Sequence, residues 1–320
     1  MSDVFKKSSD ESNELPGVGK TVGIVGVPLA FGQSMLGVEL GPAATRVAGL
    51  AAAIGKLGYE VNDRGDLRVE RPRTYPRNGD RLKYLNEVFT TCTALAAETE
   101  NIVAAGELPI TIGGDHSIAI GSLSGVTNAY RKRGQKLGLI YLDAHADMNT
   151  PETTPSGNIH GMPLAVLLGF GAPELLGIGG HGPKFDVSVC AHVGARDLDP
   201  GERQLIRQLG IRFITMREID ERGLNACMNE AIAIASEGTD GFAVTFDVDV
   251  LDPGDAPGSG TLVRGGFTYR EAHLAMEKIA ESGMMRSLEV VEINTALDVN
   301  NRTAELGVEL ILSALGKTIL

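Results

Sequence analysis

Residues 137–147 read LGLIYLDAHAD and join a run of apolar residues to a polar cluster. The run 137–142 has no polar alternation, which predicts a strand that is buried on both faces. Asp143, His145 and Asp147 follow this run at every second position. In an extended segment, a spacing of two places side chains on one face, so we expect these three to point the same way.

Short apolar runs of this kind recur along the chain and alternate with longer segments of helical periodicity. The expected strands are 22–27, 109–112, 137–142, 188–193, 212–215, 241–246 and 287–293. The expected helices are 42–57, 80–105, 117–133, 160–168, 201–209, 224–236, 269–282 and 302–315. Apolar strands separated by helices are typical of a parallel sheet that has helices on both faces.

Glycine and proline residues lie between these elements, and no central linker divides the chain. We therefore expect one doubly wound α/β domain over residues 20–320, with the single parallel sheet covered on both faces. Residues 1–19 are expected to form a mobile N-terminal tail. The stretches 66–78 and 169–187 are expected loops, and loops of that length in a compact domain are often functional.

The composition limits the classes of function. The chain has 320 residues, 29 basic and 41 acidic, for a net charge of −12. This balance disfavours binding to nucleic acid or to an anionic membrane surface. The chain has no apolar run long enough to span a bilayer, and its N-terminal residues do not resemble a secretory signal. Its three cysteines have no CxxC spacing and do not suggest a disulfide framework. We therefore expect a cytoplasmic protein.

Polar clusters follow three of the expected strands. They are GGDHS at 113–117, DAHAD at 143–147 and DVD at 247–249. In an open parallel sheet, binding sites lie outside the carboxyl ends of the strands, so we expect the three clusters to meet there. Two imidazoles and four carboxylates are then available, from His116, His145, Asp143, Asp147, Asp247 and Asp249.

Four carboxylates in one crevice would repel one another and could not all ionise without positive charge between them. Two divalent cations would balance the four carboxylates. The set of oxygen and imidazole donors contains no thiolate, which favours Mn²⁺ or Fe²⁺ over a structural zinc site. The sequence therefore predicts a dinuclear metal centre. His181, His192 and His273 lie outside the clusters and are expected in packing roles.

At this point the chain resembles a known family. The three clusters are similar to the metal motifs of the ureohydrolase superfamily, which comprises arginases, agmatinases and related hydrolases, and the likeness runs from about 22 to 315. Within the superfamily the arginases are most similar. The segments that indicate this are DAHADMNTPETTPSGNIHG at 143–161, RDLDPGE at 196–202, FTYRE at 267–271 and EVVEIN at 289–294. Thr245 stands where the family commonly has Ser.

The resemblance implies a fold, a cofactor and a role for each site residue. Two Mn²⁺ ions per subunit would be bound, one by His116, Asp143, Asp147 and Asp247, the other by His145, Asp143, Asp247 and Asp249. Asp147 would also accept a proton, His160 would shuttle protons and Glu292 would hold the guanidinium. The remaining substrate contacts would come from Asn149, Ser156, Asn158, Asp199, Glu202 and Thr261.

The activity implied by this resemblance is hydrolysis of L-arginine to L-ornithine and urea through a hydroxide that bridges the metals. A homo-oligomer, trimer or hexamer, is implied as well. An agmatinase or another guanidino-acid ureohydrolase remains as an alternative, because it would share the metal motifs. A metal-free regulatory subunit and a dinuclear phosphatase are less consistent with the sequence. All six metal ligands are present, and no Arg or Lys accompanies them to hold phosphate.

Overall fold

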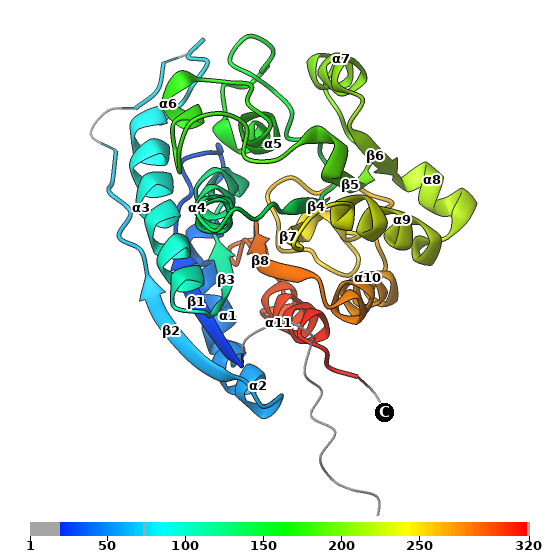
Figure 1. Cartoon of the computed structure of the whole chain (residues 1–320). Helices are drawn as coiled ribbons and strands as arrows, with labels where there is room; N and C mark the ends of the chain where they lie inside the picture. The colour runs from blue at the N-terminus through cyan, green and yellow to red at the C-terminus, as the bar shows by residue number, and fades with distance from the viewer. Residues whose placement is uncertain (1–19, 73–74, 78, 319–320) are drawn as a thin grey trace, which may run out of the picture.

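The computed structural model describes residues 20–72, 75–77 and 79–318. Within these residues, eight parallel strands form one sheet in the order β2-β1-β3-β8-β7-β4-β5-β6 (Figure 1). The strands are β1 Thr21–Val27, β2 Glu60–Asp66, β3 Leu108–Gly113, β4 Gly138–Leu142, β5 Cys190–Ala195, β6 Arg212–Thr215, β7 Phe242–Asp247 and β8 Met285–Val291. The expected parallel α/β sheet is therefore confirmed. The tail expected at 1–19 lies outside the described residues.

Helices cover both faces of this sheet, as Figure 1 shows, with α3, α4 and α5 on one side and α9, α10 and α11 on the other. The helices are α1 Gly41–Val47, α2 Leu50–Lys56, α3 Leu85–Ala104, α4 Ala119–Arg131, α5 Pro163–Leu167, α6 Pro173–Leu176, α7 Pro200–Leu209, α8 Met216–Arg222, α9 Leu224–Ser236, α10 Tyr269–Ser282 and α11 Arg302–Ala314. Each face of the sheet has an apolar layer beneath its helices. Successive side chains of a strand enter opposite layers, which explains why the strands are apolar throughout.

The β2 strand was not expected, because its sequence EVNDRGD lacks an apolar pattern. It lies at the edge of the sheet and most of its side chains are exposed. An edge strand needs little apolar surface, and charged residues on it discourage pairing with other chains. Hydropathy therefore could not reveal it.

The expected helices differ from the observed ones mainly in their limits; the helix expected at 160–168, for example, is a 3₁₀ turn at Ile159–Gly161 followed by α5. The helix expected at 42–57 is divided into α1 and α2 at Gly49, which has a φ of 88°. The helix expected at 80–105 begins only at Leu85, because Tyr84 before it has a φ of 52°. The backbone N–H of Lys83 instead donates to the carbonyl of Gly157, which ties this segment to the loop after β4. The short helices α6 and α8 lie in segments for which no helix was expected.

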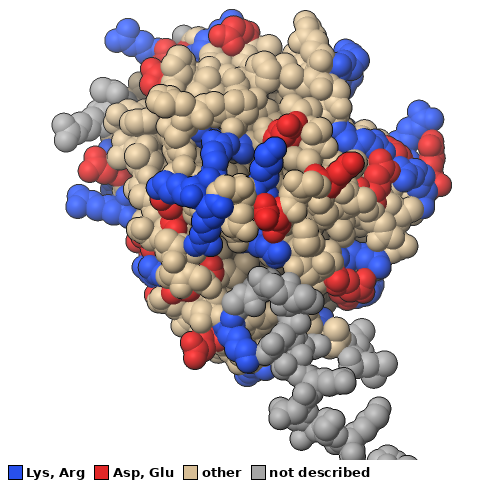
Figure 2. All heavy atoms as spheres, viewed as in Figure 1, with Lys and Arg blue, Asp and Glu red and all other residues tan. Residues whose placement is uncertain are grey.

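Charges of both signs are distributed over the surface. Figure 2 shows Lys and Arg side chains gathered near the middle of the visible face, with Asp and Glu side chains around them. Among the described residues, no helix is both long enough and apolar enough to span a membrane.

Candidate metal centre

The three polar clusters meet at the carboxyl ends of β3, β4 and β7. The imidazole of His116 is central, because its Nδ1 atom lies 3.1 Å from one carboxylate oxygen of each of Asp143, Asp147 and Asp247. These side chains are almost fully buried. Within the described chain, neither His116 Nδ1 nor Asp143 Oδ2 has a hydrogen-bond partner. Buried polar atoms are rarely left unpaired, so both atoms fit a site for a cation.

A second group adjoins the first. His145 Nδ1 lies 3.0 Å from Asp249 Oδ2 and 3.5 Å from Asp143 Oδ1. We call His116, Asp143 and Asp247 the inner group, and Asp143, His145 and Asp249 the outer group; in each, the potential ligand atoms lie within 4.8 Å of one another. Asp143 belongs to both groups, and Asp147 lies beside the inner group. This arrangement suits two ions that share a carboxylate.

The backbone brings these side chains together differently from our expectation. Residues 143–147 are not extended, because the chain bends at Ala144 and His145. Asp147 then takes a φ of 53°, in the left-handed region that Asp tolerates better than most residues. Asp249 lies in a 3₁₀ turn, where its backbone N–H donates to Asp247 Oδ1 at 2.8 Å. The expected convergence is present, but the alternation from which we inferred it is not.

The charges of the site are strongly perturbed in the metal-free chain. Burial and the neighbouring Asp143 carboxylate raise the pKa of Asp147 to about 8. Burial, with the adjacent carboxylates, also raises the pKa of Asp247 well above its usual value. Burial alone would lower the pKa of His116 and His145, but the carboxylates around them raise both pKa values. Carboxylates this close together fit a site that holds positive charge.

Glu292 lies directly beside this cluster and is fully buried. Its Oε1 accepts from the backbone N–H of His116 at 2.9 Å and lies 3.3 Å from His160 Nδ1. Its Oε2 accepts from Gln33 Nε2 at 3.0 Å. We expected strand alternation to orient Glu292, but β8 ends at Val291 and Glu292 has a φ of 65°. The left-handed backbone just beyond the strand, and not strand alternation, directs this carboxylate to the site.

His160 and Thr261 also reach the cluster. Burial would lower the pKa of His160, but the Glu292 carboxylate raises it. The Thr261 hydroxyl donates to Asp249 Oδ2 at 2.8 Å. Both residues therefore contact groups that adjoin the two metal positions.

The expected substrate-binding residues form two clusters. In the first, Asn149 Nδ2 donates to Asp199 Oδ2 at 2.8 Å. Glu202 lies behind them, and its two oxygens accept the backbone N–H groups of Asp199 and Met148 at 2.7 and 3.0 Å. Burial raises the pKa of Glu202 to about 7, although these two hydrogen bonds oppose the rise. Glu202 is thus placed to support the loop, and Asp199 is the more exposed of the two carboxylates.

The second cluster contains Ser156 and Asn158. The backbone N–H of Asn158 donates to Ser156 Oγ at 3.1 Å. Asn158 Oδ1 accepts from Ser34 Oγ at 3.1 Å and from Lys83 Nζ at 3.3 Å. Its Nδ2 group is thereby oriented away from these donors.

Sequence reasoning missed Gln33, Lys83 and Tyr141. Gln33 and Lys83 come from loops far from the metal motifs in sequence, and no local pattern marks them. Tyr141 lies within the apolar run of β4, which indicates a core residue, yet its hydroxyl donates to Asp147 Oδ2 at 2.7 Å. Only the tertiary structure shows these contacts.

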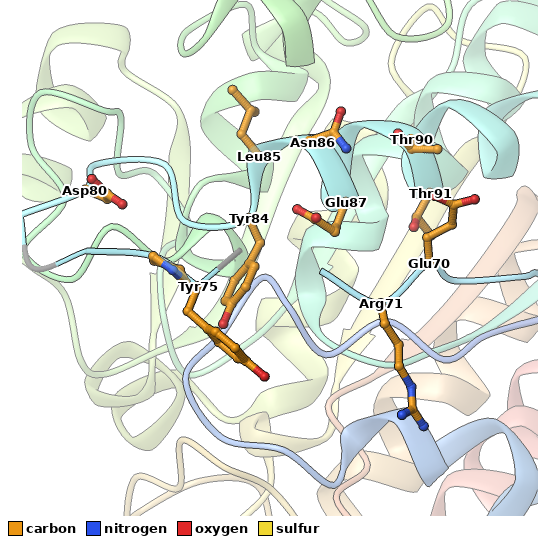
Figure 3. Close-up of a pocket in the computed structure, with 11 residues that line it drawn as sticks. Glu70, Arg71, Tyr75, Asp80, Tyr84, Leu85, Asn86, Glu87, Thr90 and Thr91 are labelled. Atoms are coloured by element: carbon orange, nitrogen blue, oxygen red, sulfur yellow. The ribbon is translucent and has the colours of Figure 1, made fainter. Parts of the chain in front are cut away.

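A separate pocket of about 480 Å³ lies at the N-terminus of α3 (Figure 3). Tyr75 and Tyr84 lie close together in it, and Glu87 and Arg71 line another part. None of the expected site residues lines this pocket. The metal centre is therefore a different site.

Comparison with known proteins identifies the family. A profile described as the Arginase family matches residues 20–316. The arginase of Bacillus caldovelox is 46% identical over 302 residues, which cover 94% of this chain and 100% of the relative. Its solved native structure matches with a TM-score of 0.90 over 94% of this chain and 100% of that chain. A structure of Entamoeba histolytica arginase in complex with L-ornithine is 31% identical, with a TM-score of 0.86, 94% coverage of this chain and 100% of that chain. These similarities confirm the resemblance seen in the sequence: the chain belongs to the arginase family of hydrolases.

Proposed function

We propose that this protein is a dinuclear manganese hydrolase that converts L-arginine to L-ornithine and urea. The observation that carries the proposal is the pair of His–Asp groups that share Asp143. Its relatives named arginase support the substrate, and one of them was solved in complex with L-ornithine.

The chain supplies carboxylate and imidazole ligands for two divalent ions, and both sets favour the same kind of metal. His116, Asp143, Asp147 and Asp247 would hold the first, and His145, Asp143, Asp247 and Asp249 the second. Mn²⁺ suits oxygen and imidazole donors. Divalent cations in such a site lower the pKa of water, so that hydroxide is available near neutral pH.

Three side chains then act on the substrate and its protons. Glu292 would pair with the guanidinium, because carboxylates bind this planar cation with charge-assisted hydrogen bonds. Among the described residues, Gln33 Nε2 is the one donor to Glu292 Oε2, which therefore retains acceptor capacity. Asp147 would accept the proton of the attacking water and pass it to the leaving amine. His160 would exchange that proton with solvent.

The amino-acid end of the substrate would be bound at the outer rim. Asn149, Ser156 and Asn158 would face the α-carboxylate. Asp199 would face the α-amino group, with Glu202 behind it. Thr261, which bonds to Asp249, would lie near the guanidinium.

The decisive experiment measures urea release from L-arginine after incubation with Mn²⁺, with agmatine as the comparison. Agmatine lacks the α-carboxylate, and sites built to hydrogen-bond a group can reject analogues without it by up to about 10⁴–10⁵. We expect a large excess of kcat/KM for arginine. Equal values would exclude arginase specificity and favour the agmatinase alternative.

We further propose that residues 20–320 act as one catalytic domain in the cytoplasm, as a homo-oligomer that is a trimer or hexamer. Light scattering coupled to gel filtration would measure the oligomer directly. A monomeric mass would contradict this part of the proposal.

A further inference from the structure

Three polar side chains lie side by side in the apolar layer behind the metal centre. Glu289 on β8 pairs with Thr245 on β7, and Thr245 pairs with Tyr141 on β4. All three are almost fully inaccessible to solvent. We call these three residues the polar row. Such groups are costly to bury unless they are hydrogen-bonded, so their partners indicate their role.

Thr245, in the middle of the polar row, contacts His116. The Thr245 hydroxyl donates to Glu289 Oε1 at 2.7 Å, and the Ser122 hydroxyl of α4 donates to Glu289 Oε2. Because the single hydroxyl proton of Thr245 is used in this way, its oxygen must accept at its 2.9 Å contact with His116 Nε2. Nε2 of His116 therefore carries a proton, which leaves Nδ1, the atom that faces the three carboxylates, as the nitrogen available to a metal ion. That is the form of the ring that binds a metal.

Tyr141, at the β4 end of the polar row, contacts Asp147. Tyr141 donates its hydroxyl to Asp147 Oδ2 at 2.7 Å. The Tyr141 ring also stacks on the His116 ring, with centroids 4.8 Å apart and planes inclined by 22°. Asp147 has a left-handed backbone and follows a bend, so regular strand structure does not fix its direction. The bond from Tyr141 can supply that restraint.

We infer that the polar row positions His116 and Asp147 as ligands of the inner metal ion and thereby sets the affinity of the inner position. Both ligands come from segments beyond the regular strands, whereas Asp247 is the last residue of β7. The three row residues are positioning residues, because they act through the ligands. The inference rests on the proposed dinuclear centre but not on the identity of the substrate.

The test compares isosteric variants by their metal content. Tyr141→Phe and Thr245→Val each remove one hydroxyl and keep the side-chain volume. We expect the inner Mn²⁺ to bind about 10–100-fold more weakly, as is usual when a group that orients a metal ligand is removed. After dialysis at limiting Mn²⁺, mass spectrometry of the metals should then give close to one ion per chain. Electron paramagnetic resonance should show an isolated ion in place of a coupled pair.

Two matched controls use the same region. Thr245→Ser keeps the hydroxyl and should retain two ions. His192→Phe should also retain two, because His192 continues the row on β5 and stacks on Tyr141, and its ring nitrogens bond no side chain of the inner group among the described residues. Circular dichroism melting of each metal-free variant checks that the fold is intact.

Wild-type affinity for both ions in Tyr141→Phe and Thr245→Val would overturn the inference. Loss of both ions together with a lower melting temperature would also overturn it, because the row would then be structural only. A wild-type protein with fewer than two ions would contradict the inference and the dinuclear proposal together. A wild-type protein that holds two ions but does not cleave arginine would contradict only the proposed function.

Discussion

The inner and outer groups contain the same kinds of ligand but differ in their surroundings. The His116 side chain is 1% exposed and its Nδ1 has three carboxylate oxygens at 3.1 Å. The His145 side chain is 28% exposed and has carboxylate oxygens from two residues, at 3.0 and 3.5 Å. The inner group is therefore enclosed and contacted from behind by Tyr141 and Thr245, whereas the outer group is partly open to solvent. We therefore expect two similar ligand sets to differ in metal affinity and in exchange rate because their surroundings differ.

The largest effect should come from the residue that the two groups share. Asp143→Asn removes a charge from both positions, so we expect both ions to be lost and activity to fall by at least ~100-fold. Metal analysis and urea release on one preparation measure this. Asp252→Asn is the control, because Asp252 follows the same strand as Asp247 but binds the backbone of Gly254 and Gly265. Retention of one tightly bound ion in Asp143→Asn would show that the groups do not share this ligand.

Glu292→Gln should separate substrate binding from metal binding. The substitution keeps the shape and removes the charge that would pair with the guanidinium. Loss of a desolvated charged pair costs about 2–5 kcal/mol, or roughly 30-fold to several thousand-fold in kcat/KM. We expect the metal content to remain at two ions. Glu305→Gln on α11, where the side chain is exposed, serves as the control.

Two results would change the role of Glu292. Activity within about threefold of wild type would remove it as the guanidinium partner. A parallel loss of metal and activity would instead place it among the supports of the inner position. Asp199 and Glu202 would then be the next carboxylates to test.

His116→Asn and His145→Asn should distinguish the two positions. Each variant loses one ligand, so we expect one ion to bind about 10–100-fold more weakly in each. Chelator treatment of wild-type protein should release the outer ion first, because His145 is partly exposed. Stopped-flow measurement of Mn²⁺ release to the chelator should show two kinetic phases in wild-type protein. The phase that is missing in each variant identifies the position that the substituted residue serves. A single phase in wild-type protein would mean that the two positions do not differ in exchange.

The smallest effect concerns pH. Burial raises the pKa of Asp147 to about 8 in the metal-free chain, above its unfolded value. A carboxyl group with a raised pKa stabilises the fold at low pH, and this contribution is lost as the pH rises through about 8. Mn²⁺ replaces the proton, so the gain in melting temperature on adding Mn²⁺ should be greater at pH 8.5 than at pH 6. Each kcal/mol corresponds to about 2–4 °C in a chain of this kind. An equal gain at both pH values would contradict the expectation.

Sequence patterns predicted the sheet because buried strands are apolar throughout, and they predicted the His–Asp cluster because its members follow the ends of three such strands. Strands such as β4 and β7 are apolar throughout, and their polar ends are marked by closely spaced Asp and His residues. The strand β2 escaped prediction because an exposed edge does not need apolar residues. Hydropathy therefore indicates which strands are buried, but it does not indicate which segments form hydrogen bonds with a neighbouring strand.

The details of the site could not be predicted in the same way. Asp147 and Glu292 have φ values of 53° and 65°, which no alternation pattern reveals. Gln33 reaches Glu292 from a distant loop, and Tyr141 is indistinguishable in sequence from an apolar core residue. These contacts depend on tertiary packing, which brings together residues that are far apart in the chain.

The sheet order also determines when the centre can assemble during synthesis. β8 is the last strand in sequence but lies between β3 and β7, in the middle of the sheet. Until it is inserted, the β2-β1-β3 part that carries His116 has no strand contact with the β7-β4-β5-β6 part that carries Asp143 and Asp247. In a nascent chain that lacks residues 285–291, the sheet therefore does not connect the ligands of the inner group. Because contacts between distant segments are slow to form, closure of the sheet by β8 should be a late step in folding, and metal capture should follow it.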